Sequence, residues 1–292
     1  MTLVRCADPD AAARWCAETH AAGERLGFVP TMGALHEGHL GLVRRALAEN
    51  ERACVSVFVN PLQFDDPKDC ERYPRDLEAD ARLLESVGCS MLFTGTLAQF
   101  FPEVAPGAPV PRRDPGPAAG GLEGEFRPGH FAGVATICAR LFERVRPRRA
   151  YFGEKDYQQC QVVQHLAAEL GYPEIVVCPT SRDPDGLARS SRNLLLAPEE
   201  RAEALALSRA LFAARAAWQA GERTPERLEA RLRGELSRAR VAVDYAEVRD
   251  PQRFAERPRA PLVRARALIA ARVGRVRLID NLDLAAPAGG GA

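Results

Sequence analysis

Short apolar runs alternate with longer amphipathic segments through the first 180 residues. The runs at 26–29, 53–59, 90–93, 149–153 and 175–178 read as strands, and most are apolar at nearly every position. The intervening segments repeat apolar residues at helical spacing, and turns rich in Gly, Pro and polar residues separate the two kinds of element. Strands buried on both faces and alternating with helices are typical of a parallel sheet. The pattern predicts an α/β domain over residues 1–180.

The pattern changes beyond about residue 180. A long helical segment rich in Ala, Leu and Arg covers 198–237, and apparent strands follow at 241–248, 261–271 and 274–280. Helices and then strands in separate blocks indicate an α+β unit. We therefore expect a smaller C-terminal α+β domain over 181–284, tethered by the 181–193 loop, and a tail at 285–292.

The strongest candidate site is the turn 30–39, between the strand at 26–29 and a helix. Gly33 and Gly38 leave room for a phosphate near the backbone, and the following helix presents unpaired N–H groups to it. His36 and His39, at i and i+3, share one helix face and could donate ring N–H groups to a nucleotide phosphate. The alternative is that one histidine caps the helix and the other is merely exposed. A zinc site would need an i, i+4 histidine pair and a third ligand.

Further polar residues follow other predicted strands. Gln63 comes just after the 53–59 strand, where a parallel sheet binds its ligands. Asp80 lies on the same helix side as Asp76, so the two suit either Mg²⁺ or the acidic first turn of an ordinary helix. The segment 102–129 is too long for a routine connection and indicates a flap or a partly disordered insertion.

Lys155 is conspicuous because the chain has 40 basic residues, of which only Lys68 and Lys155 are lysines. A lysine retained against this arginine bias favours a role for a compact ammonium group. Lys155 follows the 149–153 strand in a second strand-turn-helix layout, so we expect it to contact phosphate. The 180–193 loop combines hydroxyl and guanidinium groups suited to closing over phosphates.

Composition excludes several classes of protein. The formal net charge of +1 gives no overall electrostatic footprint for nucleic acid or an acidic membrane. No apolar run reaches the roughly 18 residues of a membrane span, and no signal peptide is evident, so we expect a cytoplasmic protein with no membrane partner. The eight cysteines contain no Cys-x-x-Cys pair and read as reduced packing residues.

The motifs together resemble the pantothenate synthetase (pantoate:β-alanine ligase, AMP-forming) family. The resemblance extends over nearly the whole chain and rests on these segments: 30–39, 58–64, 73–75, 127–131, 152–159, 190–193, 243–245 and 277–281. It implies a Rossmann-like nucleotidyltransferase domain followed by a small C-terminal lid domain, in a homodimer. It also implies ATP-dependent condensation of pantoate with β-alanine through an enzyme-bound pantoyl adenylate, giving pantothenate, AMP and pyrophosphate.

The resemblance also implies roles for individual residues, with His36, His39, Lys155 and Arg192 as the catalytic group. ATP would be bound by Met32, His36, His39, Gly153, Lys155, Asp156, Ser190, Ser191 and Arg192, with Met32 near the pantoyl group. Gln63 and Gln159 would bind pantoate, Arg127 and His130 would lie on the β-alanine side, and Asp80 would bind Mg²⁺.

Two positions depart from the family pattern, because Arg189 replaces a methionine and Leu195 replaces a tyrosine. Both changes could alter loop closure and ATP affinity.

Two other functions compete with the ligase. One is an adenylyltransferase acting on a phosphorylated acceptor, for which the neutral amides of Gln63 and Gln159 are poorly suited. The other is an ATP sensor or RNA-binding protein without enzymatic activity, which the near-neutral charge disfavours.

Overall fold

The computed structural model describes residues 2–286, which divide into two compact units. The first unit comprises residues up to Ala119, Arg127–Glu154 and Gln158–Cys178. The second comprises Gly120–Phe126, Lys155–Tyr157 and the described chain from Pro179 onward. Two short segments that precede Pro179 in the chain therefore belong to the second unit.

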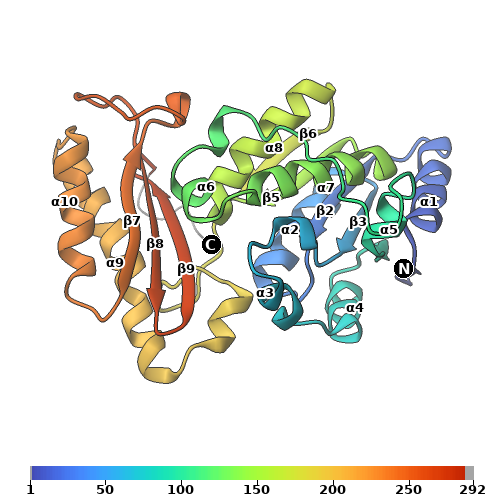
Figure 1. The fold of residues 1–292 in the computed structure, drawn as a ribbon, viewed down its shortest axis with the longest axis horizontal. Coiled ribbons are helices and arrows are strands. Elements are labelled where there is room, and N and C mark those ends of the chain that lie inside the picture. The colour runs from blue at the N-terminus through green and yellow to red at the C-terminus, as the bar shows by residue number, and fades with distance from the viewer. Residues whose placement is uncertain (1, 287–292) are drawn as a thin grey trace. The chain divides into compact units, whose positions relative to one another are not determined.

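The first unit is built on a six-stranded, wholly parallel sheet with strand order β1-β4-β3-β2-β5-β6 (Figure 1). Its strands are β1 (Val4–Cys6), β2 (Leu26–Thr31), β3 (Arg52–Val57), β4 (Met91–Phe93), β5 (Arg149–Gly153) and β6 (Glu174–Cys178). Its α-helices are α1 (Pro9–Ala21), α2 (Glu37–Glu49), α3 (Pro67–Arg72), α4 (Leu77–Ser86), α5 (Leu97–Phe100), α7 (His130–Val145) and α8 (Tyr157–Leu170), the last of which starts in the second unit. Single turns of 3-10 helix are η1 (Pro61–Gln63), η2 (Pro117–Ala119) and η3 (Glu154–Asp156), of which η3 spans both units.

Both faces of this sheet are buried, as the apolar runs predict. Successive residues of one strand point to opposite faces and enter different cores. Phe28 packs with residues of α1, α7 and α8, whereas Val29 packs with residues of α2 and α4. Tyr151 is fully buried on the second face, and its hydroxyl donates to Glu49 Oε2 at 2.9 Å and accepts from Asn50 Nδ2 at 2.8 Å. The expected parallel α/β class is confirmed.

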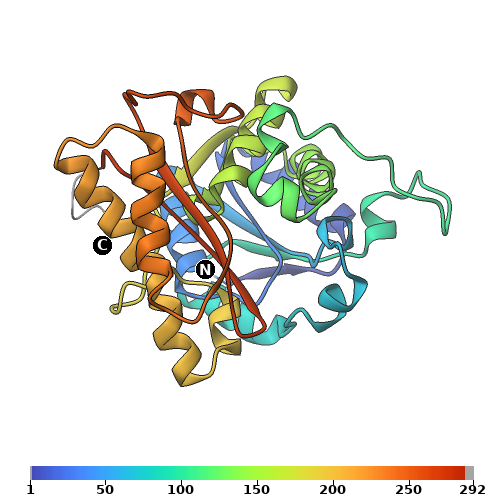
Figure 2. The same ribbon diagram turned by 60° about the vertical axis from the view of Figure 1, so that its left-hand side comes forward.

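The second unit contains an antiparallel sheet in the order β7-β8-β9. The strands are β7 (Ala242–Arg249), β8 (Arg266–Val273) and β9 (Val276–Asp283), and the helices are α6 (Leu122–Phe126), α9 (Pro198–Gln219) and α10 (Pro225–Leu236). The 3-10 turns are η4 (Ser191–Leu195) and η5 (Pro251–Arg253). The helices α9 and α10 lie against the sheet (Figure 2). Their buried residues form one core with it, which agrees with the expected α+β class.

Several sequence-based boundaries are wrong. The segment 198–237 is two helices, since α9 ends at Gln219 and α10 begins after the Thr224 cap. The strand expected at 261–271 begins only at Arg266, because Pro261–Ala265 is irregular and Val263 is 86% exposed. The three-residue strand β1 was not expected at all.

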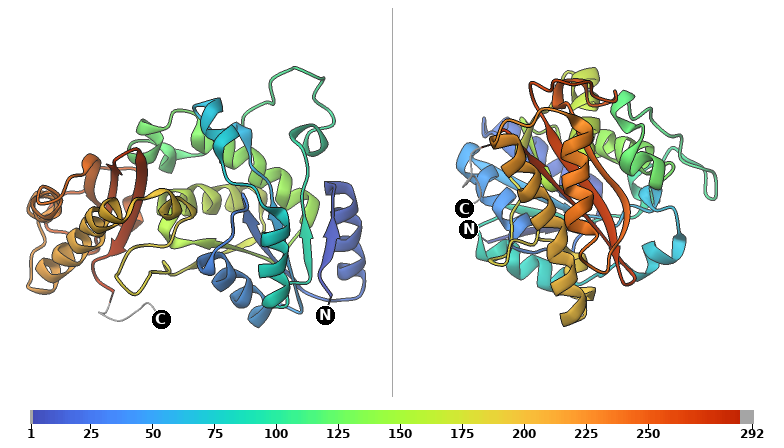
Figure 3. Two further views of the ribbon diagram at one scale, coloured as in Figure 1. Left: turned by 90° about the horizontal axis from the view of Figure 1, so that it is seen from below. Right: turned by 90° about the vertical axis from the view of Figure 1, so that its left-hand side faces the viewer.

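The segment 102–129 contains two short elements of its own, η2 and α6. Its first part extends away from the neighbouring helices (Figure 3). It then returns to α7, where Val110 is buried and the backbone N–H of Arg113 donates to Thr136 Oγ1 at 2.9 Å. Among residues 2–286, no helix has both the length and the apolar character needed to cross a membrane.

Candidate active site

The candidate site in the first unit lies at the carboxyl edge of the sheet. β2 lies between β3 and β5 in the sheet. The strands that follow in the chain are added first on the β3 side of β2 and then, from β5 on, on its other side. Such a switch point is where open parallel sheets bind ligands. The turn 32–36 follows β2, the η1 turn follows β3, and Gly153 ends β5.

His36 and His39 cap α2 reciprocally. The backbone N–H of Gly38 donates to His36 Nδ1 at 3.1 Å, and the backbone N–H of His36 donates to His39 Nδ1 at 3.3 Å. The ring centroids are 4.0 Å apart. Because Nδ1 accepts in both rings, the proton of each neutral imidazole lies on Nε2. Capping therefore sets both rings in the tautomer that donates through Nε2, so the capping role and the phosphate role are compatible.

Asp80 anchors the turn that precedes α2. Its Oδ2 accepts from the Ala34 N–H at 3.1 Å and its Oδ1 from the Leu35 N–H at 2.7 Å, although the residue is only 2% exposed. Burial raises the pKa of Asp80, and these two backbone hydrogen bonds oppose the rise. Gly33 has φ +86°, and a Cβ there would lie 3.0 Å from Asp80 Oδ2 and 2.9 Å from Val57 Cγ1. The glycine is thus required both by its backbone conformation and by the close approach of Asp80.

Gln63 is buried at the carboxyl end of β3 and is linked to the β2 turn. Its Oε1 accepts from Asn60 Nδ2 at 3.0 Å, and its Nε2 donates to the Met32 thioether at 3.0 Å. Asn60 also donates to the Gly133 carbonyl at 3.2 Å, which ties η1 to α7. The carboxamide is therefore oriented by two fixed partners, one of which is only a weak acceptor.

Arg127 and His130 lie at the start of α7 and hold the Gln63 backbone. His130 Nδ1 is 2.9 Å from the Gln63 carbonyl oxygen, which can only accept, so Nδ1 carries the proton. Arg127 donates to His130 Nε2 at 3.2 Å and to the same Gln63 carbonyl at 3.3 Å. His130 is 5% exposed with partners at both ring nitrogens. Its evident task in this unit is to position Gln63.

Gly133 allows α7 to approach η1 at backbone distance. A Cβ at this position would lie 2.0 Å from the Leu62 carbonyl oxygen and 2.8 Å from the Gln63 nitrogen. No side chain fits there. The sequence contains no periodic signal for this contact, because Gly133 and the η1 turn are about seventy residues apart in the chain.

Lys155 and Asp156 belong to the second unit. Lys155 Nζ lies 3.3 Å from Asp156 Oδ2, and the Lys155 side chain is 18% exposed. The Lys155 carbonyl accepts from Asn281 Nδ2 at 2.8 Å. Asn281 is 3% exposed. It lies in the family-matching segment 277–281, but no individual role was predicted for it from the sequence.

Ser190, Ser191 and Arg192 are also in the second unit, at the start of η4. Ser190 Oγ accepts from the Arg192 N–H at 3.3 Å and caps the turn. The Arg192 side chain has no hydrogen-bond or ion-pair partner among residues 2–286. Leu195, at the family's tyrosine position, is 50% exposed.

The loop 181–193 is held by charged contacts in the second unit. Arg182 and Ala188 form an isolated antiparallel bridge. Asp183 accepts from Arg189 Nε at 2.9 Å and from an Arg201 guanidinium nitrogen at 2.8 Å. Arg189, at the family's methionine position, is thus a loop-bracing residue.

The remaining predicted residues are Gly153 and Gln159, both in the first unit and partly buried. Gln159 lies in the first turn of α8, and within the described chain its side chain has no hydrogen-bond partner. Among the described residues, no group of three or more His, Cys, Asp or Glu is arranged to hold a metal ion.

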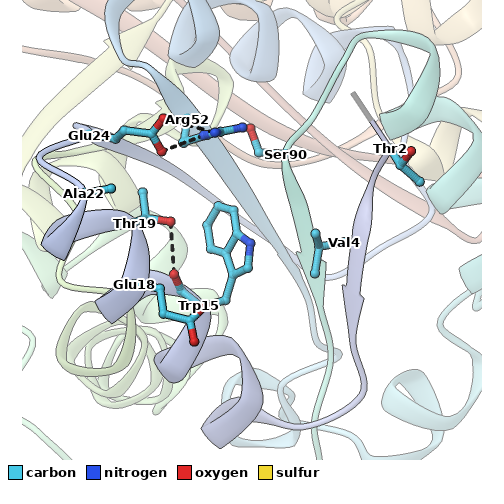
Figure 4. A pocket seen from close by; sticks show the side chains of 9 residues that line it. All are labelled: Thr2, Val4, Trp15, Glu18, Thr19, Ala22, Glu24, Arg52 and Ser90. Atoms are coloured by element: carbon cyan, nitrogen blue, oxygen red, sulfur yellow. Dashed lines mark hydrogen bonds and ion pairs between the residues drawn. The ribbon is translucent and has the colours of Figure 1, made fainter.

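A separate cavity of about 270 Å³ lies beside α1 and β1 (Figure 4). Its lining includes Val4 and Arg52, the first residues of β1 and β3, and Ser90, which precedes β4. It therefore opens at the amino ends of the parallel strands, and it contains no predicted site residue. Arg52 there is paired with Glu24 at 2.7 Å.

Comparison with known proteins places the chain in a family. The family model for pantoate-beta-alanine ligase matches residues 5–283. The pantothenate synthetase of Rubrobacter xylanophilus is 50% identical over 278 residues, covering 93% of this chain and 94% of that protein. The pantothenate synthetase of Aquifex aeolicus is 44% identical over 262 residues, covering 89% and 91%.

Solved structures agree with the sequence relatives. The crystal structure of pantothenate synthetase from Thermus thermophilus has a TM-score of 0.85 at 44% identity, covering 97% of this chain and 99% of that chain. That of the pantoate-beta-alanine ligase from Francisella tularensis, complexed with beta-gamma ATP and beta-alanine, has a TM-score of 0.78 at 30% identity, covering 98% and 99%. The chain therefore belongs to the pantoate-beta-alanine ligase family, whose members are pantothenate synthetases.

Proposed function

We propose that this chain condenses pantoate with β-alanine in two ATP-dependent steps. In the first step a pantoate carboxylate oxygen attacks the α-phosphorus of ATP, and pyrophosphate leaves. In the second step the amine of β-alanine attacks the acyl carbon of the bound pantoyl adenylate, AMP leaves with the electron pair of the C–O bond, and the amine loses a proton. The products are pantothenate, AMP and pyrophosphate.

The observation that carries the proposal is the reciprocal histidine cap at the switch point of the sheet. A carboxylate is a poor electrophile until AMP makes one of its oxygens part of a good leaving group. Catalysis of that step needs alignment of anions and neutralisation of developing charge, without a covalent nucleophile. His36 and His39 supply two preset Nε2–H donors for the triphosphate, beside the N-terminus of α2.

Pantoate binding is assigned to Gln63 and Gln159. Among the described residues, the Gln63 amide donates only to the Met32 thioether. A substrate oxygen is a stronger acceptor that can replace this sulfur. Gln159 has no competing intramolecular hydrogen bond in residues 2–286. Neutral carboxamides suit a small hydroxy acid, because they donate to its carboxylate and accept from its hydroxyl.

ATP binding is assigned to further residues besides His36 and His39. Lys155, Ser190, Ser191 and Arg192 offer an ammonium, two hydroxyls and a guanidinium to the phosphates. Met32, Gly153 and Asp156 complete the nucleotide and adenylate contacts. We place Arg127 and His130 on the β-alanine side, where His130 acts through the Gln63 backbone and Arg127 offers a cation to the incoming carboxylate.

Mg²⁺ is expected as the counterion of ATP, but Asp80 fits poorly as its ligand. Each Asp80 oxygen already accepts a backbone N–H, and the residue is 2% exposed. The assignment of Asp80 to the metal stays a prediction, and its visible task is to hold the turn before His36.

The domain bounds, the oligomeric state and the cellular compartment of the chain are also proposed. We infer an ATP- and pantoate-binding domain over 1–180, a lid domain over 181–284 and a tail over 285–292. The family resemblance supports a homodimer. All eight cysteines are free thiols, which suits a reducing compartment such as the cytoplasm.

Pyrophosphate release with pantoate present and β-alanine absent tests the proposed function. We expect about one equivalent of pyrophosphate per active site and a bound species with the mass of pantoyl adenylate. An adenylyltransferase for another acceptor would release none under these conditions, and a non-enzymatic ATP sensor would release none under any. Either of those results contradicts the proposal.

Variants of His36 separate catalysis from capping. His36→Asn retains a good helix cap, whereas His36→Ala removes both the cap and the imidazole. We expect His36→Asn to slow adenylate formation about a hundredfold while the unfolding midpoint stays close to that of the unmodified chain. Lys155→Ala and His39→Ala should each cause a loss of similar size. Near-normal rates in His36→Asn and Lys155→Ala would show that the phosphate assignment is wrong.

A further inference from the structure

The segment Lys155–Tyr157 is held at both ends by one hairpin of the second unit. At one end, Asn281 on β9 donates its side-chain amide to the Lys155 carbonyl at 2.8 Å. At the other end, the Arg266 guanidinium on β8 lies over the Tyr157 ring, 4.0 Å from its centroid. The turn that carries the candidate phosphate-binding lysine is therefore fixed to the β8–β9 hairpin.

The two holding residues are also joined to each other. Arg266 donates to Asn281 Oδ1 at 2.6 Å, and both residues are less than 5% exposed. In the β8–β9 register Asn281 pairs with Leu268, so Arg266 and Asn281 are diagonal neighbours on one face of the sheet. Buried amides and guanidinium groups need partners, and here each supplies one to the other. The side-chain geometry of Asn281 is thereby locked, with its oxygen toward Arg266 and its nitrogen toward Lys155.

A buried carboxylate next to Asn281 completes the array. Asp280 is 3% exposed and forms a two-pronged ion pair with Arg182, at 2.7 and 2.9 Å. Its Oδ1 also accepts from the Asn281 backbone N–H at 2.8 Å. The positive charges of Arg182 and Lys155 both stabilise the Asp280 carboxylate against the effect of burial. The array therefore fixes Asn281 through its backbone as well as its side chain.

We propose that Asn281, with Arg266 behind it, is a positioning residue for Lys155 in adenylate formation. The inference rests on the proposed role of Lys155 as a phosphate ligand. A lysine ammonium is a point charge on a flexible stem, so its placement depends on the backbone that carries it. Displacing a catalytic group by about 1 Å can cost on the order of a hundredfold in rate. Neither Asn281 nor Arg266 needs to touch a substrate for this role.

A double-mutant cycle tests the proposal. The variants are Asn281→Asp, Lys155→Ala and their combination, compared by the single-turnover rate of pyrophosphate release at saturating ATP and pantoate. Asn281→Asp keeps an acceptor for Arg266 but cannot donate to the Lys155 carbonyl. We expect Asn281→Asp to lower this rate at least tenfold, to leave the pantoate KM nearly unchanged, and to cause little further loss when Lys155 is already alanine.

Matched arginine variants control for damage to the sheet. Arg249 on β7 is 6% exposed and is bound to Glu247 at 2.5 Å, so Arg249→Lys replaces a comparably buried guanidinium in the same sheet. Arg266→Lys keeps the charge but loses the planar group that both stacks on Tyr157 and reaches Asn281. We expect Arg266→Lys to slow adenylate formation and Arg249→Lys to leave it close to normal, with both variants folded by circular dichroism.

The outcomes separate this inference from the proposed function. An Asn281→Asp loss of equal size with and without Lys155 would overturn the positioning role while leaving the phosphate role of Lys155 intact. An unchanged rate in Asn281→Asp would also overturn it. An unchanged rate in Lys155→Ala would overturn the phosphate assignment itself, and the inference with it.

Discussion

Replacing Gly133 with alanine should damage both stability and pantoate binding. The new Cβ would lie 2.0 Å from the Leu62 carbonyl oxygen and 2.4 Å from the Leu62 carbonyl carbon. Ordinary contacts of a Cβ begin at about 3.4 Å, so α7 and η1 would have to separate by roughly 1.4 Å. The obstructing atoms are backbone, which cannot rotate away as a flexible side chain can.

The magnitude follows from this geometry. Overpacking typically costs about 1–3 kcal/mol, and a clash with backbone belongs at the upper end. A loss of about 3 kcal/mol corresponds to a fall of roughly 6–12 °C in the unfolding midpoint of a chain of this size. The same displacement would strain the contacts that fix Gln63, namely those of Asn60 with Gly133 at 3.2 Å and of His130 with the Gln63 carbonyl at 2.9 Å. We therefore expect kcat/KM for pantoate to fall by about a hundredfold.

Thermal unfolding and steady-state kinetics at varied pantoate provide the assay, with Gly41→Ala as the control. Gly41 is also a helical glycine of the first unit, but a Cβ there would meet no heavy atom within 4 Å. Its replacement should stabilise α2 by up to about 1 kcal/mol. If Gly133→Ala unfolded at the same temperature as Gly41→Ala and kept normal pantoate kinetics, the close contact of α7 with η1 would be refuted.

Two further predictions concern pH and loop order. Burial raises the pKa of Tyr151 from its usual 10 to about 12, so the stability contributed by the protonated phenol is complete below about pH 10 and is lost as the pH rises through 12. Between about pH 10 and pH 12, the free energy of unfolding from urea titration should fall more steeply in the unmodified chain than in Tyr151→Phe, and equal slopes would contradict this. Asp183→Asn should raise the KM for ATP several-fold with little change in kcat, because Arg189 and Arg201 lose the carboxylate that braces the 181–193 loop. An unchanged KM would show that this bracing does not contribute to ATP binding.

The sequence predicted the class of fold because burial of both sheet faces leaves continuous apolar runs. Phe28 and Val29 are neighbours in one such run and enter different cores. The strand order could not be read from the runs, since the pairing of β2 with β3 and β5 depends on tertiary contacts. The run near Leu262 misled the strand assignment, because its apolar residues lie in an irregular segment before Arg266.

The candidate site was predictable where chemistry is encoded in local spacing. Two glycines and the His36–His39 spacing sufficed to identify the turn before α2. The reciprocal cap was not predictable, because it depends on the rotamers of both rings and fixes a tautomer that spacing cannot specify. Asn281 lies in the family-matching segment 277–281, but its relation to Lys155 could not be predicted, since it spans 126 positions and exists only through the folded hairpin.

An oxygen-transfer experiment tests the central claim most directly. The carboxylate oxygens of pantoate are labelled with the heavy isotope of oxygen, and the AMP formed with ATP and β-alanine is analysed by mass spectrometry. Attack of the carboxylate on the α-phosphorus, followed by release of AMP from the acyl carbon, predicts one labelled oxygen in the phosphate of AMP. AMP without the label would contradict a pantoyl adenylate intermediate.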